Sequence, residues 1–350
     1  MSKLTDKLLK VNTIKNTAIL SQSKFFKEEY YDTGIPILNL AMSAKLDGGF
    51  TYGLTTLAGQ SKTAKSLIML YLAKQYLDNN EDSVLILYDC EFGTHNQMID
   101  SVGIDRDKII HKPIMHVEEL KIDLMQTFEE IERSDNVIIG VDSFGEIPSA
   151  KETEDALDGK TVADMSRAKA LNSLFRLIKP QLNTRKIPLI GVGKTYKTQE
   201  KYAKDVLGGG EGITKQSDTI FFIGKQQEVE GTGSTRNFKG STFILKVNKG
   251  RLVRERSEFP LTILFETGIE KYSGLLDIAL DLGFVTKPKV GWFKRGGDEK
   301  NYRRKDTNNA NFWDPILNDP KFQELTYKKY SYDLVEQTEG EKVDEKNIDK

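Results

Sequence analysis

The octet Gly59-Gln60-Ser61-Lys62-Thr63-Ala64-Lys65-Ser66 lies between a β-like run, Leu54–Ala58, and a helix-like amphipathic stretch, Ser66–Leu77. It follows the pattern G-x-x-x-x-G-K-[ST], in which backbone N–H groups surround phosphates, the lysine reaches the terminal phosphoryl oxygens and the hydroxyl holds Mg²⁺. The second glycine is Ala64. If the backbone is left-handed there, alanine costs roughly 1–2 kcal/mol relative to glycine, which a packed loop can absorb. We expect nucleotide binding, with a chance turn before a helix as the alternative.

The composition is that of a soluble globular protein, with 350 residues, 38% hydrophobic and 29% charged. We expect neither a membrane span nor secretion, because no apolar run approaches roughly 18 residues and the first residues lack an apolar signal core. The expected location is the cytoplasm, or the host cytoplasm if a phage encodes the protein. The single cysteine, Cys90, excludes an intramolecular disulfide, and three scattered histidines make a zinc site improbable.

Charge is distributed unevenly although the net charge is −1. Seven acidic and three basic residues lie in 333–350, which we interpret as a disordered acidic tail. Eight basic and two acidic residues lie in 287–305, interleaved with Trp292, Phe293 and Tyr302. Basic residues with aromatics suit nucleic acid, through phosphate neutralisation and base stacking, and a solvated surface is the alternative.

The remaining pattern predicts an α/β fold with a mainly parallel central sheet. Apolar β-rich runs recur at 83–89, 136–142, 187–192, 218–223, 241–247 and 260–265, and helical spacing at 117–133 and 163–182 separates the earlier ones. Ligands gather at the carboxyl ends of the strands in such a sheet. Short connections between the last three strands predict antiparallel edge strands, and 273–284 predicts a separate helix.

Two carboxylates follow apolar strands and suit nucleotide chemistry. Asp142 ends the run from Val137 and would bind Mg²⁺ through water, opposite Ser66. Glu91 follows the strand that ends in Asp89 and would emerge at the same sheet edge, where it could orient or deprotonate an attacking water. The alternative for Asp142 is that it only serves the turn after the strand, and the alternative for Glu91 is a strand-end carboxylate that faces solvent.

Two polar segments and a pair of cations come later in the chain. Residues 149–164 are polar, and 196–214 contain the glycines Gly208, Gly209 and Gly210, which suit either a DNA-gripping loop or a linker. Lys249 and Arg251 are spaced i, i+2 on one face. They could be a surface stripe or could reach a phosphate across a subunit interface.

The chain resembles the RecA-type homologous recombinases, most closely those of T-even-like bacteriophages. The likeness runs from 17–26 to 312–315, and its most specific stretches are 88–93, 151–157, 195–200 and 272–277. It implies a RecA-like P-loop NTPase core at 33–270, a short N-terminal polymerisation segment at 1–32, a small C-terminal α/β domain at 271–332 and the tail at 333–350.

The resemblance also implies roles for individual residues. Lys65 and Ser66 would bind phosphate and Mg²⁺, Glu91 would be the catalytic carboxylate and Asp142 the Walker B acid. The segments 149–164 and 196–214, the latter with Lys197 and the glycines, resemble two mobile DNA-binding loops, and Arg176 would contact the DNA backbone. Lys249 and Arg251 would reach the ATP of a neighbouring protomer, and the segment around Phe25 and Phe26 would dock on an adjacent subunit.

Three positions depart from the family pattern. Ala64 replaces the loop glycine. Lys194 stands where a Gln or His senses the γ-phosphate in the family, so we expect ATP to be coupled to DNA affinity in a different way. Met98 falls where an aromatic ring commonly stacks on adenine; methionine can still cover a purine face, with looser base selectivity.

We therefore expect a DNA-dependent ATPase that uses ATP and Mg²⁺, forms a helical filament on single-stranded DNA and exchanges strands with homologous double-stranded DNA. The other expected partners are further copies of itself, a single-strand DNA-binding protein and a loader protein, and no membrane. The alternatives are a RecA-fold hexameric helicase, which shares the core, and a non-hydrolysing DNA-binding paralogue. Ala64, Lys194 and Met98 motivate the paralogue, whereas Lys65, Ser66, Glu91 and Asp142 argue against it.

Overall fold

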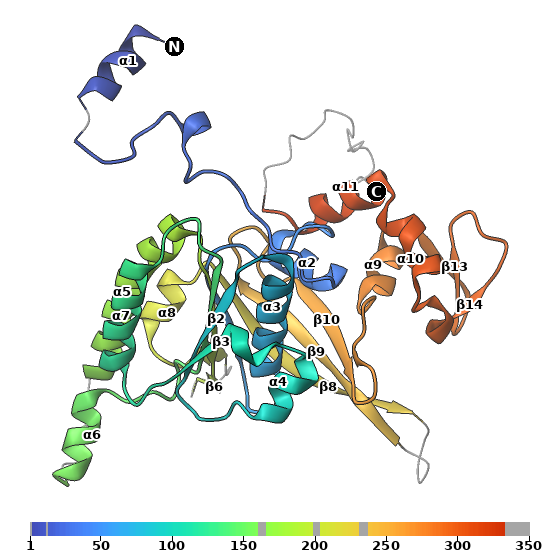
Figure 1. Cartoon of the computed structure of the whole chain (residues 1–350). Helices are drawn as coiled ribbons and strands as arrows, with labels where there is room; N and C mark the ends of the chain where they lie inside the picture. The colour runs from blue at the N-terminus through green and yellow to red at the C-terminus, as the bar shows by residue number, and fades with distance from the viewer. Residues whose placement is uncertain (1, 12, 160–165, 199–203, 231–236, 333–350) are drawn as a thin grey trace, which may run out of the picture.

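The computed structural model of the protein describes residues 2–11, 13–159, 166–198, 204–230 and 237–332 (Figure 1). Its centre is a nine-stranded sheet with the strand order β11-β10-β9-β8-β1-β5-β4-β2-β3. The tail, 333–350, lies outside the described residues.

One half of this sheet is parallel, as the alternation of strands and helices predicts. Its strands are β1 (Gly53–Gly59), β2 (Val84–Asp89), β3 (Ile109–Pro113), β4 (Val137–Asp142), β5 (Pro188–Gly193) and β8 (Thr219–Glu230). The edge strand β3 was not predicted, because its sequence Ile-Ile-His-Lys-Pro has only two apolar residues and its side chains are largely exposed. The α/β fold class is confirmed.

The other half is antiparallel, which confirms the prediction from the short connections. It consists of β9 (Asn237–Lys249), β10 (Glu258–Leu264) and β11 (Gly268–Ile269), beside β8. Strands β8 and β9 extend several residues beyond the apolar runs that predicted them, because the pairing continues through polar positions such as Gln226↔Thr242.

Helices cover both faces of the parallel half (Figure 1). One face packs against α3 (Lys65–Asn79) and α4 (Asn96–Val102), and α2 (Pro36–Ser43) belongs to the same hydrophobic cluster but packs against β10 of the antiparallel half. The other packs against α5 (Val117–Glu130), α7 (Ser166–Arg185) and α8 (Glu211–Gln216). All eight residues of α2 are buried. Such a helix lacks a polar face, so helical periodicity could not predict it.

The segments expected to be loops contain regular structure. Residues 149–164 include α6 (Ala150–Leu157), whose N-terminus has a capping box between Ser149 and Glu152. Residues 196–214 include the hairpin of β6 (Thr195–Lys197) and β7 (Asp205–Leu207), followed by α8. The described parts of the two expected loops therefore contain a helix, a hairpin and a short helix, while 160–164 and 199–203 lie outside the described residues.

A small α/β domain follows the main sheet, as expected. It contains α9 (Leu275–Asp281), a three-stranded antiparallel sheet, a 3₁₀ turn and two further helices. Their bounds are β12 (Val285–Lys289), β13 (Trp292–Arg295), β14 (Tyr302–Arg303), η4 (Arg304–Thr307), α10 (Ala310–Leu317) and α11 (Pro320–Tyr330). Its buried Phe312, Trp313 and Phe322 join the same hydrophobic cluster as α2 and α3.

The N-terminal segment extends away from the sheet (Figure 1). It contains α1 (Lys3–Lys10) and the 3₁₀ turn η1 (Leu20–Gln22); a further turn, η2 (Arg106–Lys108), precedes β3. Leu4 and Leu8 on α1 are exposed. The Arg133 guanidinium lies 5.0 Å from the Phe25 ring centroid, whereas Phe26 is 67% exposed. The Phe25 ring is therefore already in contact with a side chain of its own protomer, and Phe26 is the more exposed of the two rings.

Candidate functional site

The phosphate loop connects β1 to α3 and has the strained backbone that its sequence suggested. Ala64 has φ +57°, in the left-handed region, and so does Lys62 at φ +63°. The alanine therefore carries the roughly 1–2 kcal/mol cost estimated from the sequence. Gly59 cannot be replaced in the same way, because a Cβ there would lie 2.7 Å from the Ile223 carbonyl oxygen. The tight approach of the loop to β8 thus requires glycine at its start.

Lys65 points into this loop. Its Nζ donates to the Gln60 carbonyl oxygen at 2.8 Å, and the residue is only 8% exposed. Burial lowers the pKa of the Lys65 ammonium; Asp142 and Glu91 oppose the shift and Lys194 adds to it. These charges are therefore close enough to act on one another.

Asp142 ends β4 and meets Ser66, the second residue of α3. Their side chains are hydrogen-bonded, and Asp142 is 6% exposed. Burial raises the pKa of the Asp142 carboxyl, and the Ser66 hydrogen bond counteracts part of the rise. A hydroxyl and a carboxylate side by side provide the hard oxygen ligands that Mg²⁺ prefers. The two residues fit the metal role predicted for them.

Glu91 lies two residues beyond Asp89, the strand neighbour of Asp142. Asp89 pairs with Asp142 across β2 and β4, and the Glu91 backbone N–H donates to the Asp142 carbonyl oxygen at 3.2 Å. The Ser143 hydroxyl donates a short hydrogen bond to Glu91 Oε1. This contact fixes one carboxylate oxygen and leaves Oε2 for another partner.

Lys194 follows β5, the strand between β1 and β4. Its Nζ lies 3.7 Å from Glu91 Oε1 and 3.0 Å from Glu146 Oε1. The lysine thus stands between two carboxylates at the same edge of the sheet as the phosphate loop.

Strand alternation explains why these side chains share one face. Leu85 and Leu87 of β2, and Ile138 of β4, belong to the cluster packed on α3. Because side chains alternate along a strand, Asp89 and Asp142 face α3 as well. The structure therefore brings together the predicted Lys65, Ser66, Glu91, Asp142 and Lys194 at the carboxyl ends of β1, β5, β4 and β2.

Lys249 and Arg251 lie away from this edge. Ile220 pairs with both Thr56 and Lys249, whereas Gly59 pairs with Ile223, so Lys249 is three residues, about 10 Å, behind the loop along the strands. Its Nζ donates to the Thr214 and Lys215 carbonyl oxygens, each at 3.0 Å. Arg251 Nη1 lies 3.6 Å from Asp218 Oδ1. The structure does not join these cations to the phosphate loop of their own chain.

Met98 lies on α4, partly buried against the cluster that includes α3. Arg176 is exposed on α7. The triple glycine has a folding role: the Gly208 N–H donates to the Lys194 carbonyl oxygen at 2.8 Å, and Gly209 and Gly210 have φ +97° and +86°. These glycines turn the chain into α8, which side chains at 209 and 210 would oppose.

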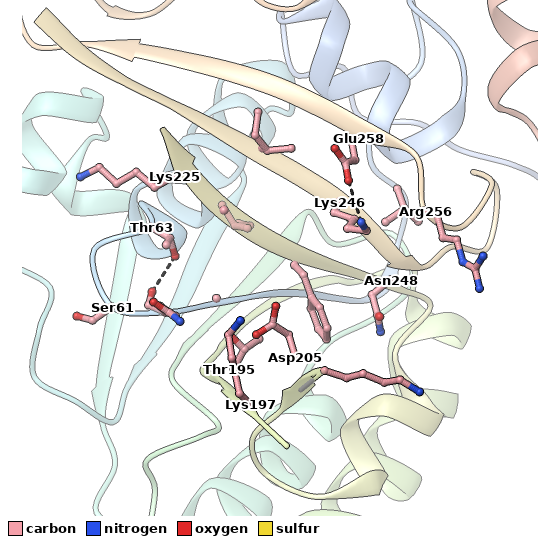
Figure 2. A pocket seen from close by; sticks show the side chains of 18 of the residues that line it. Ser61, Thr63, Thr195, Lys197, Asp205, Lys225, Lys246, Asn248, Arg256 and Glu258 are labelled. Carbon is pink, nitrogen blue, oxygen red and sulfur yellow. Dashed lines mark hydrogen bonds and ion pairs between the residues drawn. The ribbon is translucent and has the colours of Figure 1, made fainter. Parts of the chain in front are cut away.

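A cavity of about 1230 Å³ opens beside the phosphate loop, between the β6–β7 hairpin and the outer face of β8 and β9 (Figure 2). Lys246 in it pairs with Glu258 at 2.8 Å. Six cations line it, against three carboxylates: Lys62, Lys197, Lys204, Lys225, Lys246 and Arg256 against Asp205, Glu255 and Glu258. The predicted DNA-binding residue Lys197 therefore shares a basic wall with the phosphate loop.

Two aromatic rings of the basic stretch 287–305 already contact other residues of the chain. The Arg303 guanidinium lies 4.0 Å from the Trp292 ring centroid, and Phe293 is buried. Phosphate neutralisation by this surface needs no rearrangement, whereas stacking of a base on Trp292 would have to compete with Arg303.

The sequence reasoning missed two residues of the site, Ser143 and Glu146. Ser143 directly follows the recognised Asp142, so a search for donors beside the strand end could have found it. Glu146 carries no such signal, because only the folded positions of β4 and β5 bring it to Lys194. The single cysteine, Cys90, directly follows β2 and is half-buried, and burial raises its pKa to about 12.

Two comparisons with known proteins are informative. Residues 272–326 match the family described as the C-terminal domain of the bacteriophage T4 recombination and repair protein. The chain is 41% identical, over an alignment of 350 residues, to the recombination and repair protein of Enterobacteria phage T4, and the alignment covers 97% of this chain and 88% of the relative. Among the described residues, no helix is long and apolar enough to cross a membrane.

Proposed function

This chain belongs to the UvsX family of phage recombination and repair proteins, within the RecA-type recombinases, and we propose that it is an ATP-dependent DNA recombinase. The observation that carries the proposal is the meeting of Lys65, Ser66, Asp142 and Glu91 at one sheet edge, beside a loop of phosphate-binding sequence. Each has the chemistry that phosphoryl transfer to water requires.

The chain's own residues divide the work of hydrolysis. Lys65 binds the terminal phosphoryl oxygens in place of its present contact with the Gln60 carbonyl. Ser66 and Asp142 would hold Mg²⁺, which would neutralise negative charge on the phosphates of the nucleotide. Glu91 orients the attacking water and accepts its proton through Oε2, since Ser143 already holds Oε1. Lys194 senses the γ-phosphate.

Nucleotide is shared between protomers of a filament in this proposal. Lys249 and Arg251 lie about 10 Å or more behind the phosphate loop of their own chain, so they act on the ATP of a neighbour. Head-to-tail contacts of this kind give open helical filaments when the rotation does not close. The N-terminal segment, with its exposed Leu4, Leu8 and Phe26, supplies the apolar surface for docking.

DNA binds in the filament through its backbone. Lys197, Arg176 and the segments that include α6 and Gly208–Gly210 grip single-stranded DNA, and the basic stretch 287–305 receives double-stranded DNA. Phosphate contacts position a strand without reading its sequence, which leaves recognition to base pairing. A single-strand DNA-binding protein and a loader protein would assist assembly.

Steady-state ATP hydrolysis with and without single-stranded DNA tests the proposal. We expect hydrolysis that requires Mg²⁺ and is stimulated by DNA, and joint molecules when a homologous duplex is added. Nucleotide binding without hydrolysis would instead identify a non-hydrolysing paralogue. Strand separation without pairing would identify a helicase.

A further inference from the structure

Glu146 occupies an unusual position relative to the site. It lies four residues after Asp142, and its Oε1 is 3.0 Å from Lys194 Nζ, closer than the 3.7 Å between Lys194 and Glu91. The side chains of Lys194 and Glu146 are 41% and 44% exposed. The pair can therefore separate without opening any packed core.

The backbone on both sides of Glu146 is held firmly. Phe144 and Ile147 are fully buried, and the Phe144 N–H donates to the Val192 carbonyl oxygen at 3.1 Å. The Arg167 guanidinium, from α7, donates to the Gly145 and Ile147 carbonyl oxygens. Glu146 thus projects from a fixed point, and only its side chain has to move.

Lys194 is anchored in a similar way. It directly follows β5, and its carbonyl oxygen accepts from the Gly208 N–H at 2.8 Å. Its ammonium is near enough to Lys65 to lower the pKa of that lysine. The charge of Lys194 can therefore act on a phosphate that Lys65 binds. The phosphate and the Glu146 carboxylate then compete for the Lys194 ammonium.

We propose that Glu146 is a specificity-determining residue for the terminal phosphate: it holds Lys194 when no γ-phosphate is bound and releases it when one is. This inference rests on the proposed ATP binding and deepens it. The γ-phosphate must displace a carboxylate from Lys194, whereas ADP leaves the ion pair intact. Glu146 therefore weakens the binding of ATP and leaves the binding of ADP unchanged. It makes the affinities of the protein for the two nucleotides more alike.

The exchange also connects the site with both predicted DNA segments. Glu146 lies three residues before Ser149, the N-cap of α6. Lys194 directly precedes the β6–β7 hairpin, and its carbonyl oxygen accepts a hydrogen bond from the Gly208 N–H just after β7. Release of Glu146 frees a negative charge beside the first segment at the same moment as Lys194 moves toward the phosphate. Both effects depend on the terminal phosphate alone.

The test measures binding of ADP and of the slowly hydrolysed analogue ATPγS to the full-length protein with Mg²⁺, for wild type, Glu146→Gln, Lys194→Gln and the double variant. We expect Glu146→Gln to bind ATPγS about two- to fivefold more tightly, the range that an exposed ion pair allows. Its ADP affinity should equal that of wild type. The double variant should match Lys194→Gln, because Glu146 acts only through Lys194.

Glu129→Gln is the matched control, since it removes one negative charge from the exposed end of α5. Equal changes for both nucleotides, no change, or weaker ATPγS binding in Glu146→Gln would overturn the inference, and so would an effect of Glu146→Gln that persists without Lys194. Melting curves verify that each variant is folded. If wild type binds neither nucleotide, the proposed function itself fails; if it binds both and the variants do not differ, only the role of Glu146 fails.

Discussion

The two ends of the central sheet differ in the groups that surround their charged side chains. At the carboxyl ends of β1, β4 and β2, Lys65 and Asp142 are buried beside the more exposed Glu91, and the three charges influence one another. Toward the opposite end, Lys249 contacts main-chain carbonyls and the exposed Arg251 lies 3.6 Å from Asp218. One end is a site within a protomer, and the other has cations suited to a phosphate from elsewhere. This difference is what the proposed sharing of one nucleotide between two protomers requires.

Removing the Glu91 carboxylate, which is proposed to position water at the first of these ends, should have the largest effect on ATP hydrolysis. Glu91→Gln keeps the size of the side chain and its contact with Ser143 but loses the base, so we expect ATP hydrolysis to fall by about 10²–10⁴-fold. Nucleotide affinity should stay within a few-fold of wild type, whereas Lys65→Ala should lose binding of the terminal phosphate. Turnover and nucleotide binding are measured on the same preparations, with Glu129→Gln as the charge control. Unchanged turnover in Glu91→Gln would remove Glu91 from catalysis.

Removing a cation from the opposite end of the sheet should have the next largest effect on ATP hydrolysis. Arg251→Ala should lower DNA-stimulated hydrolysis by about 10²-fold, less than the roughly 10³–10⁵ of a lone arginine finger, because Lys249 remains. Mixing Arg251→Ala with Lys65→Ala protomers should restore activity at interfaces that combine an intact loop with an intact cation pair. Mixtures of each variant with wild type provide the reference. If no mixing ratio exceeds the sum of the separate variants, the nucleotide is not shared.

Lys194 should have a smaller effect, on the difference between nucleotide states. Its ammonium is a strongly hydrated point charge and fixes direction less tightly than an amide or imidazole. Lys194→Gln should therefore change the ratio of single-stranded DNA affinities with ATPγS and with ADP, by about threefold for a contact of this exposure. Fluorescence anisotropy with a labelled oligonucleotide measures the ratio. An identical ratio would make Lys194 a bystander.

The acidic tail should have the smallest effect. Residues 333–350 carry seven acidic and three basic side chains, and the basic stretch 287–305 is a surface for which they can compete with DNA phosphates. Truncation after Tyr332 should strengthen duplex binding a few-fold at low salt and steepen its salt dependence, with ATP affinity unchanged. Duplex affinity across a salt series, for full-length and truncated protein, makes the comparison. Equal affinities throughout would leave the tail with a role in solubility alone.

Local chemistry made part of the site predictable. A phosphate loop is a continuous stretch whose residues act through their own backbone, so Gly59–Ser66 was recognisable, including the left-handed Ala64. Asp142 and Glu91 were predictable because apolar runs reveal strands, and parallel strands present their carboxyl ends at one edge. The fully buried α2 and the short edge strand β3 gave no periodic signal, so they were missed.

The sequence by itself determined the α/β class, the antiparallel edge and the residues of the phosphate loop, because these depend on the periodicity and chemistry of short segments. Only the tertiary structure decided which distant side chains meet. The contact between Glu146 and Lys194 depends on the adjacency of β4 and β5, and the separation of Lys249 from its own loop depends on strand register. Register and strand order are set by the packing of the whole sheet between its helices, which no local segment encodes.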